Sequence, residues 1–187
     1  IILDKAGLES LHETLEPEQE LILEGAQGLA LDERLGAFPY VTRSITGLLG
    51  AAAVAAFEFN ATEIQPIYIT RAYLTRHGAG PLPFEGEIIT DRPLTDATNI
   101  ENQWQGSLRY APLNLQQLKE LISADLYRTQ TSAAVTSKGI IVKRPQLLLT
   151  CLDQLGAQVN IVTAAGVLSS VSSTNLPQVV SRELGRE

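Results

Sequence analysis

The sequence contains no methionine, a single cysteine and only two histidines among its 187 residues. The lone Cys151 excludes an internal disulfide and a cysteine-rich zinc site, and it is typical of a protein kept in a reducing compartment. We therefore expect a cytoplasmic location. Because the sequence opens on Ile1 and has no initiator methionine, we also expect a piece of a longer protein or a trimmed chain.

Basic residues are scarce as well, since 14 lysines and arginines stand against 21 aspartates and glutamates, for a formal charge of -7. A surface of this sign repels a phosphate backbone, so we expect no nucleic-acid partner. Long apolar runs are also missing, because the longest, residues 48–57, has about half the length that a bilayer requires. No charged start with an apolar stretch and a cleavage site indicates secretion, and we expect no membrane partner.

The hydrophobic content, 44% of the residues, is enough for a folded core. No internal repeat or low-complexity linker divides the chain, so we predict a single domain over residues 1–187. Spacing and composition predict an amphipathic helix over 4–20, a helix over 44–57 capped by Ser44 or Thr46, and a helix over 113–126 capped by Asn114. They predict a buried strand over 21–23, a strand over 67–75, and apolar strands over 146–153 and 159–163. A polar loop is expected over 91–102, and a Ser-rich, then helical segment after Gly166. This order predicts an α/β fold with a partly parallel sheet flanked by helices.

Two junctions between a predicted strand and a loop carry polar groups. The first is Glu-Gly-Ala-Gln-Gly at residues 24–28, and the second, at residues 75–85, is too rich in glycine and proline to continue a strand. In parallel sheets, ligands bind outside the carboxyl ends of the strands. Both junctions are therefore candidate sites, and the alternative for the first is a simple tight turn.

Longer motifs surround both junctions. Residues 24–28 are followed by Leu31 and Asp32 and then by Gly-Ala-Phe-Pro-Tyr-Val-Thr at 36–42, while residues 72–83 read Ala-Tyr-Leu-Thr-Arg-His-Gly-Ala-Gly-Pro-Leu-Pro. These motifs, in this order, resemble the signatures of the adenylosuccinate synthetase family. A looser match lies at residues 149–153, and the resemblance covers roughly residues 20–170.

The resemblance implies a purine-nucleotide ligase of AMP biosynthesis. Members use GTP to phosphorylate the oxygen on C6 of IMP, and the amino group of aspartate then displaces that phosphate to give adenylosuccinate, GDP and phosphate. The family fold is a P-loop-type synthetase fold, and this sequence resembles its carboxyl-terminal portion. The amino-terminal half, with the phosphate loop, the catalytic histidine and the Mg²⁺ ligands, has no counterpart here, so we expect this chain alone to be inactive.

The resemblance also assigns roles to residues of the two motifs. It places Gln27 against IMP near the reacting C6 position and Thr42 against the IMP phosphate; the alternative is that both only stabilise a turn. It implies that the backbone of His77 and Gly78 contacts the IMP ribose, although the family has valine at the position of His77. Surface, stacking or acid-base roles stay open for that imidazole.

Further along the chain the match becomes partial. Arg109 takes the place of the family arginine that meets the nucleotide phosphate, but Ser107 replaces the arginine that bridges IMP and aspartate, which leaves aspartate open as co-substrate. Asp153 and Gly166 correspond to residues that contact guanine. Cys151 replaces the lysine of that motif, so the nucleotide is GTP or, alternatively, ATP.

Two functions follow from these matches. The chain is part of an adenylosuccinate synthase-type ligase, or it is a degenerate, non-catalytic module for nucleotide binding or assembly. In either case an incomplete sheet leaves an unpaired edge and an apolar face. We therefore expect a homodimer, or a complex with the amino-terminal half of the ligase.

Overall fold

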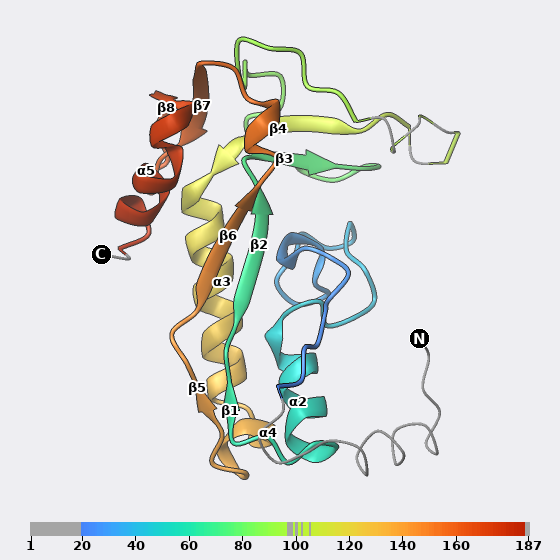
Figure 1. The fold of residues 1–187 in the computed structure, drawn as a ribbon. Coiled ribbons are helices and arrows are strands. Elements are labelled where there is room, and N and C mark those ends of the chain that lie inside the picture. The colour runs from blue at the N-terminus through green and yellow to red at the C-terminus, as the bar shows by residue number, and fades with distance from the viewer. Residues whose placement is uncertain (1–19, 97–98, 100, 102, 105, 186–187) are drawn as a thin grey trace.

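A long helix and a narrow pair of parallel strands run side by side through the molecule in the computed structural model, which describes residues 20–96, 99, 101, 103–104 and 106–185 (Figure 1). The helices are η1 (Leu29–Leu31), α2 (Leu48–Phe57), α3 (Leu115–Gln130), α4 (Ala133–Thr136), η2 (Leu152–Gln154), η3 (Ser173–Asn175) and α5 (Leu176–Glu183). The strands are β1 (Glu63–Ile64), β2 (Ile67–Arg71), β3 (Tyr73–Arg76), β4 (Arg109–Asn114), β5 (Ile141–Val142), β6 (Gln146–Thr150), β7 (Gln158–Val162) and β8 (Leu168–Ser172). Apart from Glu20, the predicted opening helix lies outside the described residues.

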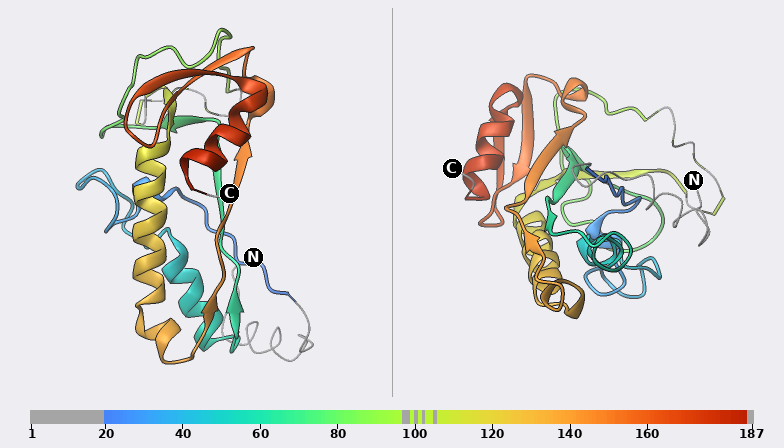
Figure 2. Two further views of the ribbon diagram at one scale, coloured as in Figure 1. Left: turned by 90° about the vertical axis from the view of Figure 1, so that its left-hand side faces the viewer. Right: turned by 60° about the horizontal axis from the view of Figure 1, so that its bottom comes forward.

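Parallel and antiparallel pairs are both present, as expected for a partly parallel α/β fold. Strands β1 and β5, β2 and β6, and β4 and β7 pair in parallel. A four-stranded sheet in the order β3-β4-β7-β8 closes one end of the molecule, with its two outer pairs antiparallel. Helices α2 and α3 lie on one face of the β2–β6 pair (Figure 2).

The strand predicted over residues 67–75 is in fact two strands that belong to different sheets. The chain bends at Ala72, which is fully buried and donates its backbone N–H to Thr150 O at 2.9 Å. Before the bend, β2 pairs with β6; after it, β3 pairs with β4. Residues 67–75 form one run rich in β-branched and aromatic residues, so the sequence pattern alone does not reveal the bend.

The prediction of a buried strand over residues 21–23 is wrong. These three residues belong to no strand and are exposed, Ile22 by 88%. A strand is stable only when its backbone N–H and C=O groups pair with a neighbour. Among the described residues no strand pairs with this segment, so its apolar side chains have no face to pack against.

Helix α2 begins later than predicted and is capped differently. Gly47 is its N-cap, and neither Ser44 nor Thr46 caps it with a side chain. The backbone N–H of Leu48 instead donates to the Asp125 carboxylate at 2.9 Å. A buried acid from another helix thus replaces the local cap, because it reaches the same unpaired N–H groups.

Helix α3 begins as predicted, and its Asn114 cap is confirmed. The Asn114 side chain accepts from the Gln117 N–H at 3.0 Å, and the helix continues to Gln130. The predicted strand over residues 146–153 ends at Thr150, because Cys151 takes a left-handed conformation and η2 follows. Helix α5 lies in the segment predicted to be helical after Gly166.

Four strands were missed by sequence reasoning, the two-residue strands β1 and β5 and the longer strands β4 and β8. Strand β4 contains Pro112, and β8 reads Leu-Ser-Ser-Val-Ser, so neither has the apolar alternation of a typical strand. Both are held by neighbours that lie far away in the sequence or across a turn. The main core lies beneath them and includes Tyr73, Leu113 and Ile161. Across the part of the chain that the structure describes, no helix has the length and apolarity to cross a membrane.

Candidate functional site

The first motif folds as a loop, residues 24–46, around the side chain of Asp32. This carboxylate is fully buried and accepts the backbone N–H of Arg34 at 2.9 Å and that of Thr46 at 2.8 Å. A longer bond of 3.3 Å comes from the N–H of Leu35. Because these donors are residues 34, 35 and 46, Asp32 holds the two ends of the segment 34–46 together. We call residues 24–46 the first-motif loop.

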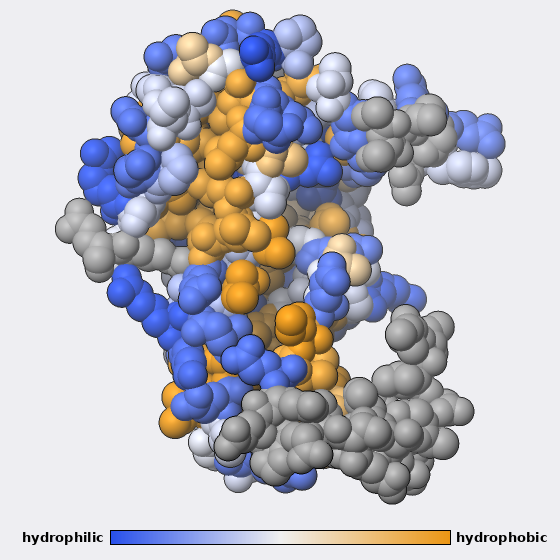
Figure 3. Space-filling view, viewed as in Figure 1, coloured by the Kyte–Doolittle hydropathy of each residue, from blue (hydrophilic) through white to orange (hydrophobic). Residues whose placement is uncertain are grey.

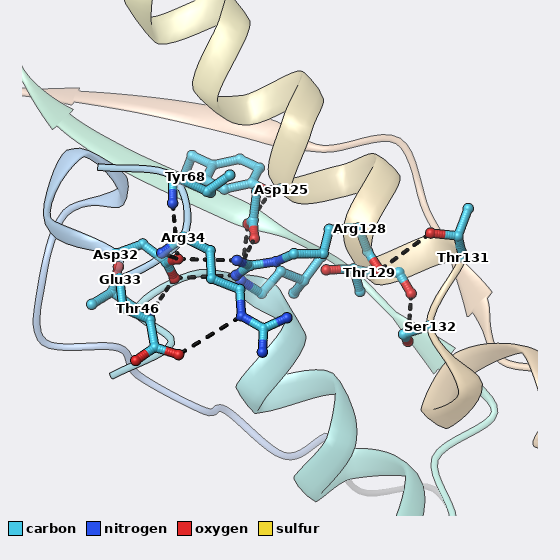
Figure 4. Close-up of polar contacts among 12 residues, drawn as sticks. Asp32, Glu33, Arg34, Thr46, Tyr68, Asp125, Arg128, Thr129, Thr131 and Ser132 are labelled. Carbon is cyan, nitrogen blue, oxygen red and sulfur yellow. Dashed lines mark hydrogen bonds and ion pairs between the residues drawn. The ribbon is translucent and has the colours of Figure 1, made fainter. Parts of the chain in front are cut away.

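A guanidinium from helix α3 completes the coordination of Asp32. Arg128 donates to both carboxylate oxygens, with Nη1–Oδ1 and Nη2–Oδ2 distances of 3.0 and 3.1 Å (Figure 4). Burial acts to raise the pKa of Asp32, but the hydrogen bonds from Arg128, Arg34 and Thr46 outweigh it and hold that pKa far below its usual value. The same pair raises the pKa of Arg128. Both groups are therefore charged at neutral pH.

A second buried carboxylate, Asp125, lies one turn earlier on α3 and points into the same cluster (Figure 4). Its Oδ2 accepts the Leu48 N–H and the Tyr68 hydroxyl, each at 2.9 Å. Its Oδ1 lies 3.7 Å from Arg128 Nη2. Helices α2 and α3 and strand β2 thus meet the first-motif loop at one polar cluster.

Two of the predicted site residues, Gln27 and Thr42, lie together on the first-motif loop. The Thr42 hydroxyl donates to Gln27 Oε1 at 2.6 Å, and the Thr42 backbone N–H donates to Leu31 O at 2.8 Å. Gln27 itself is exposed. The hydrogen bond orients the Gln27 amide so that its NH₂ group faces away from Thr42 and keeps its donors available.

The second motif forms another loop, residues 76–85, which contacts the first through Arg76. The guanidinium donates from Nη2 to Tyr40 O at 2.8 Å and from Nε to Ala79 O at 3.3 Å. Gly80 has a φ of +111°, and a Cβ there would lie 2.4 Å from Arg76 Nη2 and 2.7 Å from the Cβ of Tyr40. Only glycine fits where the two motif loops touch.

Arg109, the predicted phosphate contact, extends this contact region from strand β4. It donates to Gly80 O at 2.8 Å and forms an ion pair with Glu85 at 2.7 Å. Arg76 and Arg109 are directly opposite in the β3–β4 register. Burial and the neighbouring charge of Arg109 lower the pKa of Arg76. Two like charges side by side favour an anion at this place.

His77 and Gly78, the predicted ribose contacts, lie at the start of the second loop. His77 Nε2 is 2.8 Å from Asn99 Oδ1, and the Asn99 amide NH₂ donates to Asp96 at 2.6 Å. The amide orientation leaves an oxygen facing the imidazole, so Nε2 carries the proton and donates. His77 Nδ1 is buried and, among the described residues, has no hydrogen-bond partner. Gly78 has a φ of +65°, which glycine adopts readily.

The predicted guanine contacts lie apart from this region. Asp153 is exposed on η2, and Gly166 forms the turn between β7 and β8. Strands β7 and β8 lie on the opposite side of β2 and α3 from the first-motif loop (Figure 1). Ser107 is exposed just before β4. The structure therefore gathers Gln27, Thr42, His77, Gly78 and Arg109 around two touching loops and leaves Asp153 and Gly166 elsewhere. Their roles as ligand contacts stay predictions.

Sequence reasoning missed three residues that hold the site together, namely Arg128, Asp125 and Tyr68. A usable signal was present, because Asp125 and Thr129 continue the apolar stripe of α3 at spacings of three and four, and both are fully buried. A charged residue in such a stripe requires a partner. The partners of Asp125 were not visible, since Leu48 and Tyr68 lie 77 and 57 residues away in the sequence.

Comparisons with known proteins agree on one family. Residues 5–107 match a family model described as adenylosuccinate synthetase. A curated adenylosuccinate synthetase of Yarrowia lipolytica is 40% identical over 76 residues, which cover 40% of this chain and 17% of that protein. One from Geotalea uraniireducens is 45% identical over 78 residues, covering 41% of this chain and 18% of that protein.

A solved structure of fully ligated adenylosuccinate synthetase from Plasmodium falciparum is similar in fold, with a TM-score of 0.59 at 16% identity. The match covers 95% of this chain and 49% of that chain. At this identity the likeness concerns the fold alone. The chain thus spans about half the length of that protein, and the matched sequence segments span less than a fifth of the two curated relatives.

Proposed function

This chain belongs to the adenylosuccinate synthetase family, whose name denotes a purine-biosynthetic ligase, and we propose that it forms the IMP-binding part of such an enzyme. The reaction of the whole enzyme is the ligation of IMP and aspartate, driven by GTP, to give adenylosuccinate, GDP and phosphate. Within this proposal residues 1–187 act as one domain and do not catalyse alone.

The hydrogen bond between Thr42 and Gln27 carries the proposal. It leaves the Gln27 NH₂ group as a donor on an exposed loop, in a position to meet the oxygen on C6 of a purine. That oxygen needs added electron density before it can attack a phosphoryl group, and a fixed amide donor stabilises this density without adding a charge of its own.

The phosphate of IMP is assigned to Thr42 and Arg109. Thr42 has one hydroxyl proton, which Gln27 already accepts, so a bond from this hydroxyl to phosphate requires that proton to change partner. The Arg109 guanidinium donates to Gly80 O and forms an ion pair with Glu85. Together with Arg76, which lies opposite it, Arg109 supplies positive charge. The main chain of His77 and Gly78 completes the ribose side.

The phosphoryl donor is GTP, or alternatively ATP, with Asp153 and Gly166 as its contacts in this chain. The Asp153 carboxylate is exposed, and carboxylate oxygens accept the two N–H donors of guanine. Magnesium does not fit the residues at hand, because the described part of the chain contains no group of three or more His, Cys, Asp or Glu able to hold a metal. Its ligands belong, within this proposal, to the amino-terminal half.

An alternative function is a non-catalytic nucleotide-binding or assembly module. It is favoured by Ser107, which is exposed and replaces the arginine that grips aspartate in the family, and by Cys151 in place of lysine. Such a module keeps IMP binding but loses the co-substrates. Aspartate binding by the chain reassembled with an amino-terminal half separates the two functions, because only a ligase requires it.

Titration calorimetry with IMP tests the binding proposal directly. We expect Gln27→Ala and Thr42→Val each to weaken binding about fivefold, since each removes one hydrogen bond worth about 1 kcal/mol. Gln178→Ala, a change at an exposed glutamine of α5, serves as the matched control and should bind like the wild type. Equal affinity of the Gln27 and Thr42 variants and the wild type would contradict the assignment.

The partner is proposed to be a second copy of this chain or the amino-terminal half. Apolar side chains gather over β2 and β6 on the face away from α3 (Figure 3), where Ile67, Ile69 and Leu148 are 57, 66 and 51% exposed. Monomeric proteins rarely leave such a patch uncovered.

Sedimentation equilibrium tests the partner proposal, because it measures whether the isolated chain is a monomer or associates with itself. The isolated chain should self-associate, and Ile69→Lys should shift it toward monomer because a charge on this face is costly to bury. Val167→Lys, at an exposed valine between β7 and β8, should leave association unchanged. A folded wild-type monomer with no tendency to associate contradicts a second copy as the partner and leaves the amino-terminal half.

A further inference from the structure

One guanidinium holds the first-motif loop from a distance. Arg128 belongs to no motif and lies near the end of α3, yet both of its terminal nitrogens bind Asp32 of the loop. The side chain is only 17% exposed, and both Asp32 and Asp125 are fully buried. A buried charge pair of this geometry leaves little freedom to either partner.

The contacts also show which carboxylate Arg128 serves. Asp32 receives two bonds from Arg128 at 3.0 and 3.1 Å, whereas Asp125 Oδ1 lies 3.7 Å from the same guanidinium. Asp125 has its own donors in the Leu48 N–H and the Tyr68 hydroxyl. The cluster holds two carboxylates and one guanidinium, and the arginine is committed to the carboxylate on the loop.

A short chain of contacts leads from Asp32 to the ligand-facing atoms. Asp32 follows Leu31, whose carbonyl accepts the Thr42 N–H at 2.8 Å, and the Thr42 hydroxyl in turn orients Gln27 at 2.6 Å. The other end of the loop is held by the bond from the Thr46 N–H to Asp32. Moving Asp32 therefore moves both anchors of the Gln27–Thr42 pair.

We propose that Arg128 is a positioning residue for IMP, which sets the orientation of the Gln27–Thr42 pair through Asp32 without touching the nucleotide. The proposal rests on IMP binding by this loop. It gives the end of helix α3, which carries no family motif, a role in IMP binding. Lysine is a poor substitute for Arg128, because a single ammonium does not span both carboxylate oxygens.

The test measures the loop and the ligand separately. In Arg128→Met and in the milder Arg128→Lys, we expect faster amide hydrogen exchange at Thr42 and Thr46 in the ligand-free protein, and at least tenfold weaker IMP binding for the methionine variant. The IMP affinity of the lysine variant should lie between that of the methionine variant and that of the wild type. Lys119→Met removes a positive charge from an exposed position of the same helix and should bind IMP as the wild type does.

A control on the same helix distinguishes the positioning role of Arg128 from a purely structural role. Ile122→Val trims a side chain of α3 that is 5% exposed, so it should lower the melting temperature without changing exchange at Thr42 or IMP affinity. If the methionine variant does not fold, the lysine variant decides by the same two readouts. Unchanged exchange and affinity in a folded Arg128 variant overturn the proposal.

Failure of the proposed function has a different signature. If the wild type does not bind IMP, that function is wrong in the isolated chain, while exchange at Thr42 and Thr46 still reports whether Arg128 sets the loop. Faster exchange without loss of IMP affinity shows that Arg128 orders the loop but does not position the nucleotide, and it too overturns the proposal.

Discussion

Replacing Asp32 by asparagine is expected to lower the free energy of unfolding by about 3 to 5 kcal/mol at neutral pH, the usual cost of removing one partner of a buried ion pair. The change leaves Arg128 without its carboxylate and weakens the bonds from the Thr46 and Arg34 N–H groups. Urea unfolding measures the effect. Asp153→Asn, at an exposed carboxylate, is the matched control and should change stability by no more than about 0.5 kcal/mol.

The same variant should also change the acid dependence of stability. The pKa of Asp32 in the folded state lies well below the value of about 3.9 for an unfolded aspartate. Its contribution is therefore fully present above that unfolded value and is lost as the pH falls from there toward the folded pKa. Wild-type stability should decrease over this acid range more steeply than that of Asp32→Asn. Parallel curves for the two proteins would show that Asp32 does not titrate as its contacts imply.

Replacing Gly47 by alanine is expected to destabilise the protein by about 2 to 4 kcal/mol, through overpacking and loss of hydrogen bonds. A Cβ at this position would lie 2.1 Å from Asp125 Oδ1, and that carboxylate is fully buried. It must then move away from the Leu48 N–H and the Tyr68 hydroxyl. The φ of Gly47 is −87°, so the expected loss comes from contact and not from backbone strain.

Two comparisons isolate this contact. Gly28→Ala introduces a Cβ with nothing within 4 Å and should be neutral or stabilising by less than about 1 kcal/mol. In an Asp125→Ala background, Gly47→Ala should cost less than about 1 kcal/mol, because the clash is gone. An equal cost of Gly47→Ala in both backgrounds would mean that the strain lies somewhere else.

Local features of the fold were readable from the sequence because a few neighbouring residues encode them. The Asn114 cap and the apolar stripe of α3 lie within one stretch of chain, as do the apolar strands β6 and β7. The family motifs are equally local and place Gln27 and Thr42 on one loop. The coarse α/β class follows from the order of such elements.

Other features depended on contacts between residues far apart in the chain. The Leu48 cap comes from a residue 77 positions away, and Arg128 reaches Asp32 across 96 positions. The bend at Ala72 depends on Thr150, and the exposure of residues 21–23 depends on which strands lie beside them. No local pattern contains this information, since each side chain alone permits many partners.

The sequence by itself therefore determined the family, the partly parallel α/β class and the residues that the motifs assign to IMP. The tertiary structure decided that five of the seven predicted site residues surround two touching loops while Asp153 and Gly166 lie elsewhere, and that Asp32 and Arg128 hold the first loop. The reason is physical: propensity and periodicity act over a few residues, whereas burying a charge forces it to find a partner wherever the fold brings one.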